Sequence, residues 1–198
     1  MLYRPGGARL LAVAWWLLAA VLAGDLLWRG AAASAVVGVP LLAFSAAVVH
    51  AIFWFPAVLV DADGVELVNV ARRVRLPWSS VTDVDTRWAL SLQAGGQRWT
   101  SWAAPASGRR VRPVVRRETP WAEPGAEAIA GSRAPGSSAG EAAVLVGTRL
   151  EAWRLSPAGR TAVAGTGEPQ VRWNVPVLAS VGATALLGLL ALVSVPLL

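Results

Sequence analysis

The sequence predicts an α+β membrane protein with three transmembrane helices and one antiparallel β domain, which is followed by a further helix. Three observations lead to this fold class. Of the 198 residues, 55% are hydrophobic and only 15% are charged, a more apolar balance than soluble domains show. The apolar excess lies at the two ends of the chain, in stretches long enough to cross a bilayer. Between them, short segments with alternating polar and apolar residues are separated by turn residues, as in small antiparallel sheets.

The apolar stretches predict transmembrane helices over residues 10–28, 31–55 and 172–198. Each is close to or above the roughly 20 residues that a helix needs to cross a hydrocarbon core of about 30 Å. Residues 1–9 would form a short N-terminal segment. The first stretch is also compatible with a cleaved signal peptide, because Arg4 and Arg9 precede its apolar run.

The distribution of basic residues predicts the orientation in the membrane. All 18 basic residues are arginines, and all of them except Arg4, Arg9 and Arg29 lie between the second apolar stretch and the uncharged run that starts at Val175. By the positive-inside bias, we expect a multi-pass plasma-membrane protein whose N-terminus and central domain are cytoplasmic. The connection around Trp28–Gly30 would then face outward.

Residues 56–104 have the pattern of a small β domain. Asp61–Gly64 combines aspartates with a glycine and predicts a tight turn, and Val65–Val70 after it predicts a strand. Residues 73–78 alternate arginines with apolar residues, so basic side chains are expected on one face of a strand that Pro77 ends. With the later strands and a Gly95-Gly96 hairpin, about six strands suit a sandwich or a barrel.

The order of these strands, with the segment PWSSV at Pro77–Val81 and a closing hairpin on Trp99, resembles the bacterial pleckstrin-homology-like (PH-like) domains of actinobacterial membrane proteins. The similarity is greatest to the group named after low molecular weight protein antigen 6, and it covers residues 55–104. The resemblance implies a bent antiparallel barrel, capped at one end by a C-terminal helix.

The segment after the β domain contains one helical candidate between two polar linkers. Residues 141–155 place Val146, Leu150 and Trp153 at helical spacing, so they predict an amphipathic helix that either caps the β domain or remains unattached. Residues 105–140 are rich in Arg, Pro and Gly and predict a disordered linker. Residues 156–171 predict a second linker, which leads to the last span.

The sequence contains no pattern that predicts catalysis, a metal site or a cofactor site. There is no cysteine and a single histidine, His50, which we interpret as an interfacial neutral side chain. Asp61 and Asp63 lack the glycine and glutamate that a calcium loop requires at its later positions. Asp83 and Asp85 are interpreted as solvated surface acids. We therefore expect a non-enzymatic protein without cofactors.

The arginine-rich segments are the candidate binding residues. A tethered basic segment can be attracted to anionic lipids or can remain solvated, and both readings stay open for Arg109, Arg110, Arg112, Arg116 and Arg117. On the predicted PH-like domain, the face that would contact a lipid or a protein carries Arg72, Arg73 and Arg75. No nucleic-acid-binding module is recognisable.

These observations favour a scaffolding or binding module whose partner is another membrane or envelope protein. Two alternatives remain open at this point. The protein could be a lipid-regulated adaptor that uses its arginine-rich segments, or a small transporter or channel component that uses His50 and Asp25 as polar intramembrane groups.

Overall fold

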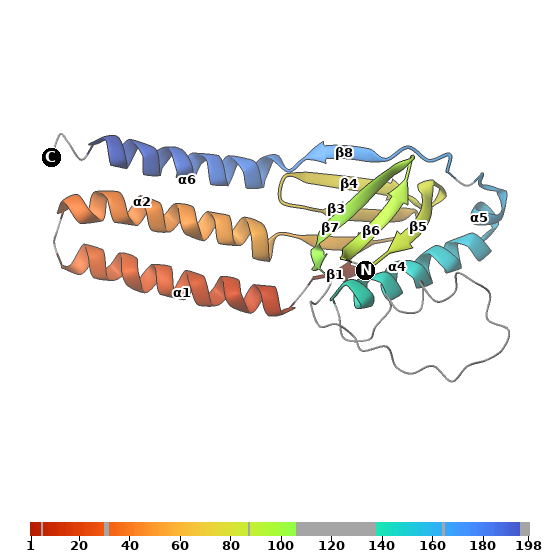
Figure 1. The fold of residues 1–198 in the computed structure, drawn as a ribbon, viewed down its shortest axis with the longest axis horizontal. Coiled ribbons are helices and arrows are strands. Elements are labelled where there is room, and N and C mark those ends of the chain that lie inside the picture. Colours follow the sequence, from red (N-terminus) through yellow and green to blue (C-terminus); the bar gives the residue numbers. More distant parts are fainter. Residues whose placement is uncertain (5, 30–31, 87, 106–137, 164, 195–198) are drawn as a thin grey trace. The chain divides into compact units, whose positions relative to one another are not determined.

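The computed structural model describes residues 1–4, 6–29, 32–86, 88–105, 138–163 and 165–194. The chain divides into two compact units (Figure 1). The β unit comprises Met1–Arg4 and Ala57–Arg172, and the helical unit comprises Pro5–Pro56 and Trp173–Leu198.

The helical unit contains three helices that are long and apolar enough to cross a membrane. They are α1 (Gly6–Trp28), α2 (Ala32–Val49) and α6 (Val175–Ser194), and α2 continues into a π-helical turn, η1 (His50–Trp54). Their candidate spans have mean hydropathies of 2.1 to 2.2. The described helices correspond to the three apolar stretches seen in the sequence.

Tryptophan side chains join α1 to α2. Trp15 donates from Nε1 to Ser45 Oγ over 3.3 Å, and Trp16 donates from Nε1 to the Ala46 carbonyl over 3.4 Å. In an apolar environment these N–H groups need partners, because an unsatisfied polar group is costly there. Nearer the other end of the helix pair, a Cβ on Gly38 would lie only 2.5 Å from Leu26 Cδ1, so glycine allows a close approach.

The β unit contains two sheets. The five-stranded sheet has the order β1-β2-β3-β4-β8, with strands Leu2–Tyr3, Ala57–Val60, Gly64–Val68, Arg72–Pro77 and Gln170–Trp173. The three-stranded sheet has the order β5-β6-β7, with strands Val81–Asp85, Ala89–Ala94 and Gln97–Pro105. Two of these strands, β1 and β8, lie in segments that the sequence had not predicted as strands.

Of the sandwich and the bent barrel that were expected, a closed barrel is not found, because the described strands form two separate antiparallel sheets. Strand β4 ends at Pro77, which has no N–H to continue the ladder. The 3₁₀ turn η2 (Trp78–Ser80) then separates β4 from β5. A register shift between Val81 and Asp83 further interrupts the start of β5.

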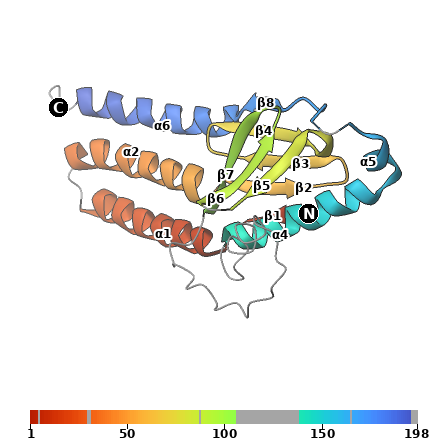
Figure 2. The same cartoon turned by 45° about the vertical axis from the view of Figure 1, so that its right-hand side comes forward.

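One hydrophobic core joins both sheets and helix α4 (Ser138–Leu155), which runs along the β unit (Figure 2). Most strands contribute every second residue, as the alternation in the sequence predicts, whereas Ala103 and Ala104 of β7 are both buried. On α4, the helical spacing buries Ala142, Ala143, Val146 and Leu150 against the strands. A short helix, α5 (Pro157–Thr161), follows and is capped by Ser156, whose Oγ accepts a hydrogen bond from the Gly159 N–H at 3.1 Å.

The turn between β2 and β3 is held from three sides. Asp61 Oδ1 accepts hydrogen bonds from the N–H groups of Asp63 and Gly64, both at 3.0 Å. The buried Trp78 donates from its backbone N to the Asp63 carbonyl over 3.0 Å and from Nε1 to the Asp61 carbonyl over 3.3 Å. Arg75 donates from Nη2 to Asp61 Oδ1 over 2.7 Å and from Nη1 to Asp61 Oδ2.

The chain enters and leaves the β unit at one end of the five-stranded sheet, which we call the exit end. Tyr3 at the end of β1 pairs with Val58 near the start of β2, so both connections to α1 and α2 lie there. Strand β8 runs antiparallel to β4, because a Cβ on Gly167 would lie 3.2 Å from Pro77 Cβ, whereas Arg172 lines a depression with Arg73. The chain therefore passes from β8 into α6 at the same end (Figure 1).

Gly64 tests the packing of β3 against β4. A Cβ at this position would lie 2.3 Å from the Leu76 carbonyl oxygen, a backbone atom that is fixed in the ladder. We expect Gly64→Ala to lower the free energy of unfolding by about 1–3 kcal/mol, as overpacking does. Gly147→Ala is the matched control, because no atom lies within 4 Å of its Cβ. In the interior of α4 this change should stabilise the fold by about 0.5–1 kcal/mol.

Thermal unfolding of the full-length chain in detergent, followed by circular dichroism, measures both variants. Opposite shifts of the midpoint are expected. A Gly64→Ala protein that melts at or above the wild-type temperature would contradict the close approach of β3 and β4.

Asp61 predicts a pH dependence of stability. The hydrogen bonds from Arg75 hold the pKa of Asp61 below its ordinary value, and the Asp63 and Gly64 N–H groups act in the same direction against partial burial. A folded pKa below the unfolded value of about 3.9 gives stability that is present above that pH and lost as the pH falls through the folded pKa. Asp61→Asn keeps an acceptor for the turn but removes the charge.

We therefore expect wild type to be more stable than Asp61→Asn at neutral pH. This difference should begin to shrink as the pH falls below about 4 and should vanish below the folded pKa of Asp61. Urea unfolding over a pH series measures it. Asp83→Asn, which removes an exposed acid on β5 outside this turn, is the matched control. A stability difference for Asp61→Asn that stays constant with pH would exclude the charge effect.

Candidate functional site

The candidate site is a polar depression of about 270 Å³ on the β unit. Three strands supply its lining, which consists of Glu66 from β3, Arg73 and Arg75 from β4, and Gln170 and Arg172 from β8. The neighbours of these residues on β3 and β4, such as Leu67 and Val74, point into the core. Strand alternation therefore places the charged side chains together on the outer face of the sheet.

Positive charge predominates in this depression, and one of its arginines is held in place by acids. Glu66 lies opposite Arg75 in the β3–β4 register. The hydrogen bonds to Asp61 raise the pKa of Arg75, and the nearby charges of Asp61, Glu66 and Asp63 act in the same direction against burial. Arg75 is thus fixed by the turn, while Arg73 and Arg172 add further positive charge beside Glu66.

This arrangement is suited to recognition of an anionic group. The planar guanidinium of arginine presents a fork of donors that matches a carboxylate or a phosphate. Gln170 adds an amide that both donates and accepts. The five lining residues include no hydroxyl, thiol or imidazole that could act as a nucleophile or a neutral-pH base. Among the described residues, no group of three or more acids, histidines or cysteines could hold a metal.

The structure brings together two of the three arginines that the sequence placed on the PH-like face. Arg73 and Arg75 line the depression, whereas Arg72 has the opposite strand parity and lies exposed at the start of β4. Sequence reasoning missed Glu66, Gln170 and Arg172. The alternation of polar and apolar residues in Gln170–Trp173 was a strand signal, but four residues before an apolar span were read as linker and membrane helix.

The arginine-rich segment with Arg109, Arg110, Arg112, Arg116 and Arg117 lies outside the described residues. Both of its flanking elements are described. Pro105 at the end of β7 pairs with Ala89, at the end of the sheet remote from the Gly95 turn. Near the start of α4, Glu141 Oε2 accepts a hydrogen bond from Tyr3 Oη at 3.2 Å, and Tyr3 marks the exit end. The chain thus leaves for this segment and returns from it at the exit end.

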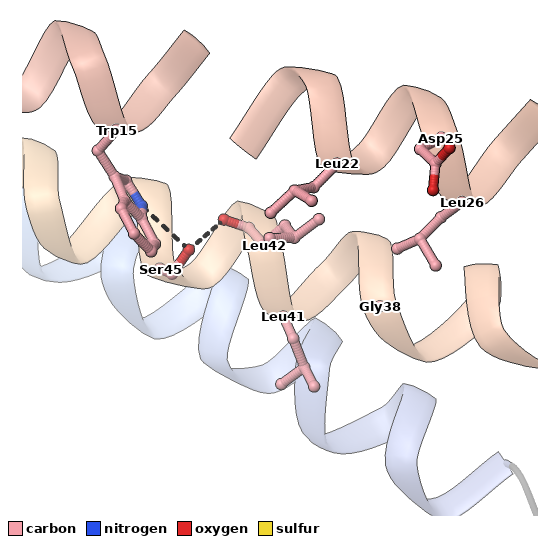
Figure 3. A pocket seen from close by; sticks show the side chains of 8 residues that line it. All are labelled: Trp15, Leu22, Asp25, Leu26, Gly38, Leu41, Leu42 and Ser45. Atoms are coloured by element: carbon pink, nitrogen blue, oxygen red, sulfur yellow. Dashed lines mark hydrogen bonds between the residues drawn. The ribbon is translucent and has the colours of Figure 1, made fainter. Parts of the chain in front are cut away.

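The helical unit contains an apolar groove of about 470 Å³ between α1 and α2 (Figure 3). Apart from Ser45 and Trp15, its polar lining is Asp25, which accepts a hydrogen bond from Arg29 Nε at 2.7 Å. His50 lies elsewhere, with its ring 5.5 Å from that of Trp16 and 6.4 Å from that of Trp54. Asp25 and His50 are therefore separate features of this unit and do not form a common polar path.

Comparison with known proteins bears on the β unit. No curated protein and no solved structure matches the chain. A family model matches a segment that begins directly after η1 and includes the arginine-rich segment. Residues 55–137 match the family described as bacterial PH domain, which confirms the bacterial PH-like domain predicted from the strand order and the PWSSV segment.

Proposed function

We propose that this protein is a non-enzymatic, multi-pass plasma-membrane protein whose cytoplasmic β unit binds an acidic segment of another membrane or envelope protein. The observation that carries the proposal is the depression lined by Arg73, Arg75 and Arg172 beside the edge strand β8. Its guanidinium groups favour carboxylates, and Glu66 within the same lining disfavours a purely anionic surface. A peptide with acidic residues could pair with the guanidinium groups, and one basic residue in the same peptide could pair with Glu66.

The position of β8 supports a peptide as the partner. Strand β8 ends the order of the five-stranded sheet, and an edge strand offers backbone donors and acceptors to an added strand. Gln170 and Arg172 belong to this strand and also line the depression. A segment that pairs with β8 would therefore bring its side chains next to Arg73.

The structure also favours the lipid-regulated adaptor as a second candidate function. Pro105 at the end of β7 and Glu141 near the start of α4 flank the arginine-rich segment in the sequence, and both lie at the exit end. Arg109 follows Pro105 by four residues, a reach of at most about 14 Å at 3.6 Å per residue. Basic residues held near an anionic leaflet contribute about 1 kcal/mol each.

The small transporter or channel component is the least supported candidate. Asp25 pairs with Arg29, and His50 packs among aromatic rings. Leucines make up half of the residues that line the groove beside Asp25 (Figure 3). An ion path needs polar groups that follow one another, and these two groups lack that arrangement.

Cysteine labelling tests the cytoplasmic orientation, and the chain provides a clean background because it contains no cysteine. In intact cells, Thr82→Cys on β5 should resist a membrane-impermeant maleimide and should react after permeabilisation. Arg29→Cys, at the end of α1, should react in intact cells. Labelling of Thr82→Cys from outside would overturn the orientation.

Site-specific photocrosslinking in living cells tests the binding face. A photoreactive amino acid at Gln170 should give a discrete adduct with an acidic protein segment, and the same group at Thr82 on the other sheet should not. Arg172→Glu should reduce the adduct several-fold, because it reverses a charge in the depression. Arg154→Glu makes the same charge change at an exposed position of α4 and is the matched control. Equal adduct yields in the Arg172→Glu and Arg154→Glu variants would exclude the depression as the binding face.

A further inference from the structure

Two tryptophans on the β unit are highly exposed. Trp88 is 82% exposed, and Trp102 on β7 is 60% exposed. Tryptophan is usually well buried in folded domains, and it is enriched at interfaces. Tryptophan is also enriched where a protein meets the bilayer interface, because its ring is apolar and its N–H is polar.

The side chain of Asn69 holds the backbone of β7 around Trp102 through two hydrogen bonds. The Trp102 N–H donates to Asn69 Oδ1, and Asn69 Nδ2 donates to the Thr100 carbonyl, both over 2.9 Å. Asn69 directly follows Val68, which pairs with Ala57 at the start of β2. The backbone of Trp102 therefore lies beside the point where the chain enters the β unit from the helical unit.

Trp88 lies at the same end. It directly precedes Ala89, which pairs with Pro105 at the end of β7. The opposite end of β6 leads into Gly95, where a Cβ would lie 2.9 Å from Pro169, just ahead of β8. Because β8 runs from there toward the exit end, the start of β6 and the end of β7 lie at the exit end.

Positive charge accompanies these aromatic side chains. Arg72 begins β4 and is exposed, and Arg172 lies close to the end of β8. Arginine donates hydrogen bonds to phosphate, so this composition matches an anionic headgroup layer better than it matches an apolar protein surface.

We propose that the exit end of the β unit contacts the headgroup layer of the bilayer directly, through Trp88, Trp102 and Arg72. The occupant is the same membrane that receives the apolar helices, because the chain passes into α1, α2 and α6 at this end. This contact goes beyond the proposed function, since it uses different residues from the depression. It would hold the PH-like domain in one orientation, with β8 available to a partner.

Spin labels on single cysteines test the contact in the full-length protein, reconstituted in vesicles of phosphatidylethanolamine and phosphatidylglycerol. We expect labels at Trp102→Cys and Trp88→Cys to show several-fold higher collision with lipid-soluble oxygen, relative to a water-soluble nickel chelate, than a label at Gln97→Cys. Gln97 is the matched control because it is exposed at the other end of β7. Two reporters guard against a single variant that fails to fold.

A label at both tryptophan positions that is as accessible to the nickel chelate as the label at Gln97 would overturn the proposal. Labels that are protected from the nickel chelate in cell membranes but accessible to it in vesicles would also overturn the proposal, because a protein would then cover this surface. A variant with glutamine at Arg109, Arg110, Arg112, Arg116 and Arg117 separates the folded surface from the arginine-rich segment. Contact that persists in this variant supports the proposal, and contact that disappears assigns the attraction to that segment and overturns it.

Discussion

The covalent path of the chain is the constraint on which the organisation of the β unit depends. The polypeptide passes between the β unit and apolar helices three times, through β1, β2 and β8. All three strands belong to one sheet, and their directions bring the three connections to the exit end. The remaining connections divide accordingly. The Asp61 turn lies at the other end and is tightly hydrogen bonded, whereas the long connection between β7 and α4 starts and finishes at the exit end.

The same sheet explains why a binding face arises from residues far apart in the sequence. Strand alternation sends Val74 and Leu76 inward, and consequently Arg73 and Arg75 outward. Strand β8, almost a hundred residues later, extends this face because the chain must run beside β4 before it enters α6. The depression therefore depends on the segment that leads into α6, because this segment supplies Gln170 and Arg172.

Part of the fold and part of the depression could be predicted from the sequence, because they depend on local features of the chain. The apolar helices, the outward Arg73 and Arg75 and the end of β4 at Pro77 depend on local length, alternation and the missing N–H of proline. The separation into two sheets, the strands β1 and β8 and the composition of the depression depend on pairing between distant segments. A strand of two to four residues, such as Leu2–Tyr3, is too short for its polar and apolar alternation to be recognised beside an apolar helix.

Helix α4 shows how the β unit can tolerate a long connection at its exit end. Residues 106–137 connect β7 to α4, and even a fully flexible connection of that length costs only about 3 kcal/mol by (3/2)RT ln n. Burying side chains such as Val146 and Leu150 contributes about 1.5–3 kcal/mol each. The contacts of α4 with the core can therefore offset loop closure by themselves.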